Sequence, residues 1–144
     1  MTRSLCIALV LTLSCITQAK EPKTDARSID GTWLPSAAEL AGEKFPDEIR
    51  KTIKLVIEDG MYTVTVGVNP DRGTLKLNPS KIPNEIDITG TDGLNKEKTI
   101  LAIYELKVDT LTICYDLSGA ARPTDFKTEK GTKLFLVTYD RQKP

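Results

Sequence analysis

The sequence predicts an all-β fold, an eight-stranded antiparallel up-and-down barrel, on two observations. Short runs with alternating apolar and polar residues recur along the chain, and helical periodicity is nearly absent. Most connections between these runs are too short for anything but antiparallel neighbours. Closure into a barrel hides both edges of such a meander, whereas a sandwich leaves edges to be guarded. The expected strands begin near Thr32, Thr52, Tyr62, Thr74, Glu85, Thr99, Thr110 and Lys133.

Three stretches define how these strands are connected. The clearest is residues 99–115, where two apolar runs meet at a short polar turn and predict a hairpin. Asp59 and Gly60 are typical of a two-residue turn and predict a second hairpin. We also expect a turn at residues 69–71, with the following strand starting at Thr74.

The remaining connections carry the irregular features. Pro35 lies inside the first expected strand and marks an irregularity or an edge position. Residues 45–51 favour a short helical turn or an irregular connection, because a proline and two acids lie near their start. Residues 117–131 are the longest stretch without a strand, and we expect this loop to fold back and place Phe126 on the barrel. All these elements fit one domain, residues 29–144.

The N-terminus is typical of a protein that leaves the cytoplasm. Residues 1–19 combine a positive start, an apolar core and a small-residue cleavage site, which predict a secretory signal peptide. Residues 20–28 are polar and predict a flexible lead to the domain. A lipoprotein signal is the alternative, because Cys15 follows an apolar run and its acylation would tether the domain to a membrane. We therefore expect an exported protein, periplasmic or extracellular, and membrane-bound only if Cys15 is lipidated.

The composition argues against several classes of function. The 20 basic and 20 acidic side chains are interspersed and carry no net charge, so the basic stripe that binds nucleic acid is missing. The chain has no histidine, which removes Ser-His-Asp and Cys-His nucleophile systems and His-based zinc sites. Cys114 is expected to be a buried structural thiol. We expect a monomer that is not an enzyme and that uses no metal and no cofactor.

Short motifs occur from one end of the domain to the other. They are Gly31-Thr32-Trp33, residues 36–42, residues 76–88, residues 103–106, residues 109–114 and Arg122-Pro123-Thr124-Asp125-Phe126. Together they resemble a family of small exported lipocalin-like domains of unknown function that is abundant in planctomycete bacteria. The chain departs from the family pattern at Val108 and at residues 34–35. The resemblance implies an eight-stranded, lipocalin-like barrel, secreted or periplasmic, with no assigned activity and no catalytic residues.

The resemblance also implies structural roles for five residues. In lipocalin-like barrels a Trp near the start closes one end and a basic residue near the last strand covers it, which implies a cation–π contact between Trp33 and Arg141. Arg122 and Asp125 are a charged pair that the family repeats in the long loop. Arg122 either fixes this loop by bonding carbonyls or a carboxylate, while Phe126 fills a gap, or recognises an anionic ligand or partner.

Small barrels are either hollow, with room for one ligand, or filled by their own side chains. The first alternative predicts a non-enzymatic, exported barrel that binds a small, largely apolar molecule. The second predicts a structural or protein-interaction domain of the cell envelope. The residues expected to face inward and to line a pocket are Tyr62, Val64, Leu75, Ile88, Tyr104 and Ile113.

Overall fold

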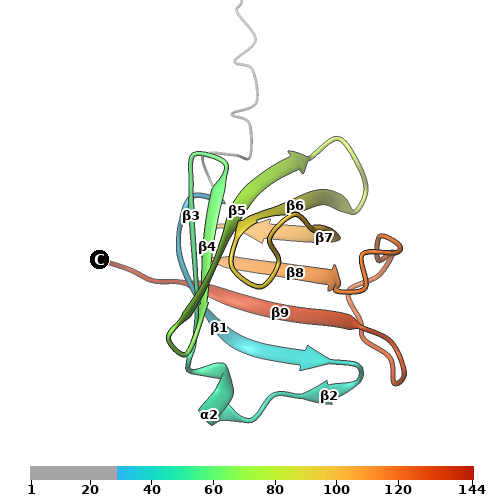
Figure 1. Cartoon of the computed structure of the whole chain (residues 1–144), viewed down its shortest axis with the longest axis horizontal. Helices are drawn as coiled ribbons and strands as arrows, with labels where there is room; N and C mark the ends of the chain where they lie inside the picture. The colour runs from blue at the N-terminus through green and yellow to red at the C-terminus, as the bar shows by residue number, and fades with distance from the viewer. Residues whose placement is uncertain (1–28) are drawn as a thin grey trace, which may run out of the picture.

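The computed structural model of the chain describes residues 29–144, which form a closed antiparallel β-barrel (Figure 1). Eight strands pair in chain order, and the last pairs with the first to close the barrel, so the predicted fold class is confirmed. The expected signal peptide, the lead at 20–28 and Cys15 lie outside the described residues. The elements are β1 (Gly31–Leu40), β2 (Glu43–Lys44), α2 (Asp47–Arg50), β3 (Ile53–Glu58), β4 (Met61–Val66), β5 (Asn69–Asn78), β6 (Asn84–Asp92), β7 (Thr99–Lys107), β8 (Thr110–Asp116) and β9 (Leu134–Arg141).

Both predicted hairpins are present. β7 and β8 pair along their length and are joined by a two-residue turn between Lys107 and Thr110. Asp59 and Gly60 connect β3 to β4 with φ values of 50° and 75°. This left-handed conformation matches the twist of the two strands, which is why a Gly is favoured there.

Residues 69–71 do not form the expected turn. They begin β5 and pair with β4, and the chain instead reverses at Gly67, whose φ is 64°. Pro70 fits near the end of a strand because its fixed φ suits an extended backbone. Asp71 consequently belongs to the strand and, like Gly73 two residues later, is buried.

β1 carries the irregularity that Pro35 predicts. The pairing of β1 with β9 shifts register between Pro35 and Ala37, which marks a β-bulge. β1 pairs with β3 over only three residues, ending at Trp33, and the segment with β2 and α2 connects the two strands. Arg50 of α2 donates a hydrogen bond of 2.6 Å to the carbonyl of Pro35 and so fixes this segment to β1.

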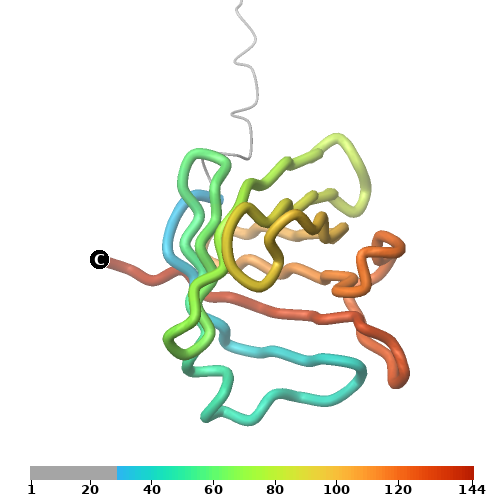
Figure 2. Tube along the Cα trace, viewed as in Figure 1, coloured from blue at the N-terminus to red at the C-terminus, as the bar shows by residue number. Residues whose placement is uncertain are grey.

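The connection between β8 and β9, residues 117–133, folds over the outer face of the barrel. Figure 2 shows it as the orange-to-red excursion at the right of the molecule. Ile103 and Cys114 alternate with inward-facing residues and so point outward, yet they are only 1% and 0% exposed. The Cys114 Sγ lies 3.7 Å from the carbonyl oxygen of Lys127 in this connection. Cys114 is therefore a buried free thiol, as expected, but it lies in a small apolar layer outside the barrel.

One end of the barrel interior is filled by large side chains, and we call it the closed end. Trp33, Tyr104 and Leu111 are all buried there. The Arg141 guanidinium carbon lies 4.2 Å from the centroid of the Trp33 ring, so the contact that the resemblance implied is present. Arg141 also donates a 2.6 Å hydrogen bond to the carbonyl of Asp30. Charge, ring and carbonyl together cover the end of the barrel.

Candidate ligand-binding cavity

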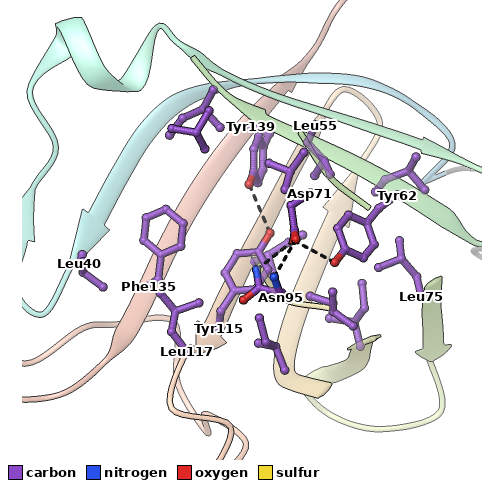
Figure 3. A pocket seen from close by; sticks show the side chains of 18 of the residues that line it. Leu40, Leu55, Tyr62, Asp71, Leu75, Asn95, Tyr115, Leu117, Phe135 and Tyr139 are labelled. Carbon is purple, nitrogen blue, oxygen red and sulfur yellow. Dashed lines mark hydrogen bonds between the residues drawn. The ribbon is translucent and has the colours of Figure 1, made fainter. Parts of the chain in front are cut away.

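The other end of the barrel contains a cavity of about 270 Å³, seen from close by in Figure 3. Every strand of the barrel contributes to its wall, and most of the side chains on it are aliphatic or aromatic. Asp71 is the only charged residue among them. The lining residues are Leu40, Phe45, Ile53, Leu55, Ile57, Tyr62, Val64, Val66, Asp71, Leu75, Ile86, Ile88, Asn95, Ile100, Ile113, Tyr115, Leu117, Phe135 and Tyr139.

The structure brings most of the predicted pocket residues together. Five of the six lie on the wall of the cavity: Tyr62, Val64, Leu75, Ile88 and Ile113. Tyr104 faces the interior but lies in the closed end, where it is buried among the core side chains and does not line the cavity. Alternation along a strand specifies the inward face but not the depth, which depends on how the strands stagger around the barrel.

A polar cluster interrupts the apolar wall at Asp71. The Asp71 Oδ2 accepts hydrogen bonds from the Tyr62 hydroxyl at 3.1 Å and from the Asn95 side-chain amide at 2.9 Å. The Asp71 Oδ1 accepts a 2.9 Å bond from the Asn95 backbone N–H. The residue is only 8% exposed. Three neutral donors therefore hold one carboxylate in a fixed position at the cavity wall (Figure 3).

Two glycines allow this cluster to form. A Cβ on Gly73 would lie 2.7 Å from the Tyr62 ring and 2.0 Å from the Thr89 carbonyl oxygen, so any side chain would displace the tyrosine or part the two strands. Gly93 has a φ of 95° and would place a Cβ 2.8 Å from the Asp71 carboxylate. Because Gly93 has no side chain, its backbone can lie close to β5, and this places Asn95 within hydrogen-bond distance of Asp71.

A second polar pair lies on the opposite part of the wall. The hydroxyls of Tyr115 and Tyr139 are 3.2 Å apart, and either of them can donate the bond. Burial raises the pKa of Tyr139 to about 12, although the bond from Tyr115 partly opposes this. Burial also raises the pKa of Tyr115 and of Tyr62 well above the ordinary value, and Asp71 adds to the effect on Tyr62. All three phenols are therefore neutral at physiological pH.

Aromatic rings form part of the cavity wall beside these hydroxyls. The rings of Tyr115 and Phe135 stack with centroids 5.7 Å apart, and Phe45 packs on Phe135 at 5.3 Å. Phe45 belongs to the segment between β2 and α2, so this irregular connection contributes directly to the cavity. The cavity thus combines aliphatic, aromatic and hydrogen-bonding surface.

Of the residues that give the cavity its polarity, the sequence predicted only Tyr62 as part of the pocket. The turn that Pro70 predicts at residues 69–71 would exclude Asp71 from a strand, although the alternation of Leu75 and Gly73 extends back to it. Tyr115 shares the inward face of Ile113 and could have been named from the same alternation. Asn95 comes from a loop, and no periodic signal places a loop residue inside a barrel.

Arg122 lies outside the cavity, on the outer face of the barrel. Its guanidinium donates to the carbonyls of Ala102 at 2.8 Å and Ile86 at 3.3 Å, and to the Asp87 carboxylate at 2.6 Å. These are the bonds expected of a residue that fixes the long loop to β6 and β7. Asp125 is exposed, and Phe126 is half-buried within the loop.

Two further features concern the residues that the structure describes. Within residues 29–144 no cysteine or carboxylate group is clustered in a way that would hold a metal ion. Over the same range, no helix is long and apolar enough to cross a membrane.

Comparison of the chain with family models, with curated proteins and with solved structures finds no match. Membership of the lipocalin-like family therefore stays a prediction from the motifs. What the chain shows by itself is a closed, eight-stranded antiparallel barrel with a cavity at one end.

Proposed function

We propose that this protein binds a small, largely apolar molecule inside its barrel and catalyses no reaction. The supporting observation is the cavity of about 270 Å³, whose wall is aliphatic and aromatic apart from a few hydrogen-bonding groups. Such a combination is typical of small-molecule sites, where apolar surface supplies affinity and a few polar groups supply orientation. The three phenols stay neutral, which suits hydrogen bonding more than proton transfer.

The volume limits the size of the ligand. An apolar cavity of about 150 Å³ holds benzene, so 270 Å³ corresponds to a molecule on the order of ten non-hydrogen atoms. Long fatty chains are too large unless part of the molecule extends beyond the cavity. We therefore favour a compact ligand with one ring or a short branched body.

We also propose that the protein acts outside the cytoplasm, as a monomeric, lipocalin-like domain. This part of the proposal depends on the signal-like residues 1–19 and on the motifs that resemble the exported family. Lipidation at Cys15 would give the same domain a membrane tether. No nucleic acid is expected as a partner, because the charges are balanced and interspersed.

The alternative is a structural or protein-interaction domain whose partner contacts the surface or the long loops. The closed end, packed by Trp33 and Leu111, fits this alternative, whereas the cavity end does not. The two functions differ in one measurable property, which is occupation of the interior by a small molecule.

Native mass spectrometry of protein purified from its own host tests the proposal. We expect a reproducible added mass on the wild type and binding of an apolar fluorescent dye. A Val64→Phe variant fills part of the cavity and should lose both, whereas Val56→Phe, on the outward face of the neighbouring strand, should keep them. Empty protein that also ignores the dye would contradict the proposal and favour the structural alternative.

A further inference from the structure

The Asp71 carboxylate contacts no basic side chain among the residues that the structure describes. Every donor that contacts its carboxylate is neutral: one phenol, one side-chain amide and one backbone N–H. Among residues 29–144, no Lys or Arg lies within ion-pair distance of it. Each other acid of the barrel that contacts a basic side chain does so on the outer surface. Within this part of the chain, Asp71 is thus a buried carboxylate without a counter-ion.

The next residue along β5 is basic, but its side chain lies on the opposite face of the strand from that of Asp71. Arg72 follows Asp71 directly, but alternation along β5 turns its side chain outward, where it pairs with Asp92 at 3.0 Å. The nearest cation in sequence is therefore unable to reach the interior. A carboxylate removed from water loses hydration that neutral hydrogen bonds only partly replace, so a cation inside the cavity would be strongly favoured.

The cavity wall is suited to such a cation. The Tyr62 hydroxyl bonds the Asp71 carboxylate, and Tyr115 lines the opposite part of the same cavity wall with Phe135 stacked on its ring. Aromatic faces attract ammonium groups electrostatically, and the attraction grows when the ion is desolvated. The rest of the wall is aliphatic and would contact an uncharged body.

We propose that the ligand is a small cationic amphiphile, a compact apolar body with a protonated amine that pairs with Asp71. This inference rests on the proposed function, because it names the class of molecule that the cavity holds. Oδ1 accepts only one of the three bonds to the carboxylate, so it retains capacity to accept an N–H of the amine. Neutral molecules with the same body can form a hydrogen bond but no ion pair with Asp71, and an acid would be repelled.

A purely structural role for Asp71 makes a different prediction. In that case the carboxylate only attaches the loop containing Asn95 to β5, and the cavity would not distinguish an amine from an alcohol. Ligand selectivity in the wild type therefore separates the two roles without any substitution.

The test is calorimetric titration of the full chain with three probes that share one ring and a short chain: phenethylamine, phenethyl alcohol and phenylpropionate. We expect the amine to bind about tenfold or more tighter than the alcohol, because the alcohol can donate a hydrogen bond to the Asp71 carboxylate but brings no positive charge to pair with it. The acid should bind weakest. Equal binding of the amine and the alcohol would overturn the inference and leave the proposed function standing. Failure of all three to bind would overturn both.

An Asp71→Asn variant tests the residue itself. The amide keeps an oxygen for the Asn95 N–H, the Tyr62 hydroxyl can turn to accept, and the Asn95 side-chain amide can rotate so that its oxygen accepts from the new NH2. With these adjustments the substitution removes the charge and keeps a hydrogen-bonding partner for each group. We expect the preference for the amine to disappear while the alcohol binds as before. Asp92→Asn removes an equal charge on the outer surface and should leave all three affinities unchanged. If Asp71→Asn retains the preference, or Asp92→Asn removes it, the assignment to Asp71 is wrong; if Asp71→Asn does not fold, the wild-type ranking decides.

Discussion

Each end of the barrel contains one largely buried charged side chain, and the two ends differ in the groups that contact it. At the closed end Arg141 lies over Trp33, donates to a backbone carbonyl and has the Asp109 carboxylate 3.6 Å away. At the cavity end Asp71 receives only neutral donors. The closed end is complete within the chain, with ring, carbonyl and counter-charge all supplied. At the cavity end the neutral donors orient the Asp71 carboxylate, but no basic side chain among residues 29–144 pairs with it and no side chain fills the cavity.

This difference between the two ends predicts that the closed end contributes more to the stability of the fold and that the cavity end binds the ligand. Side chains at the closed end contact neighbours on all sides, so their removal loses packing that nothing replaces. Those around the cavity already face open space on one side and lose less. A barrel can therefore keep its fold while one end stays adaptable to a ligand.

The largest effect should come from matched Leu→Ala substitutions at the two ends. Leu111 is 0% exposed in the closed end, whereas Leu75 is partly buried and lines the cavity. We expect Leu111→Ala to lower the free energy of unfolding by about 4 kcal/mol and Leu75→Ala by about 2 kcal/mol. Urea unfolding measures both. Equal losses would show that the two ends are packed alike and would remove the basis of the comparison.

Alkaline pH should weaken the cavity end next. Burial raises the pKa of Tyr139 from 10.0 to about 12, so the unfolded chain releases this proton before the folded one does. The stabilisation is complete below pH 10 and declines as the pH rises to about 12, by about 2 to 3 kcal/mol for this group.

Urea unfolding at several pH values, followed alongside tyrosine absorbance, measures this decline. Tyr139→Phe should show a smaller loss of stability over the same pH range, because it has no phenol to titrate. A wild type whose stability is constant between pH 10 and pH 12 would contradict the burial of this hydroxyl.

The smallest of the three effects concerns Arg141. Its replacement by Ala removes a cation–π contact and a hydrogen bond to a carbonyl, which should cost about 2 kcal/mol. Trp33 is the only tryptophan of the chain, so its fluorescence reports the change directly. Lys143→Ala is the control, because Lys143 lies near the same Asp109 carboxylate but is exposed. An equal loss of stability and an equal change of Trp33 fluorescence in the two variants would show that only surface charge matters at this end.

The elements differ in how far the sequence predicted them. The hairpin of β7 and β8 and the turn at Asp59 and Gly60 follow from local patterns, because alternation and turn chemistry act between near neighbours. The predicted turn at residues 69–71 is wrong, since proline is typical of turns but also fits an extended strand near its end, as Pro70 does in β5. The position of Tyr104 in the closed end was not predictable, because depth in a barrel depends on strand stagger.

By itself the sequence determined an antiparallel barrel of eight strands and the inward faces of those strands, because alternation and turn residues are local properties. Only the tertiary structure decided that one end is filled and the other hollow, and that Asp71, Tyr62 and Asn95 meet at the wall. These contacts join β4, β5 and a loop, and they depend on close approaches at Gly73 and Gly93. The free space inside a barrel depends on the volumes of all the inward-facing side chains and on the stagger of all the strands. No local sequence pattern specifies these quantities.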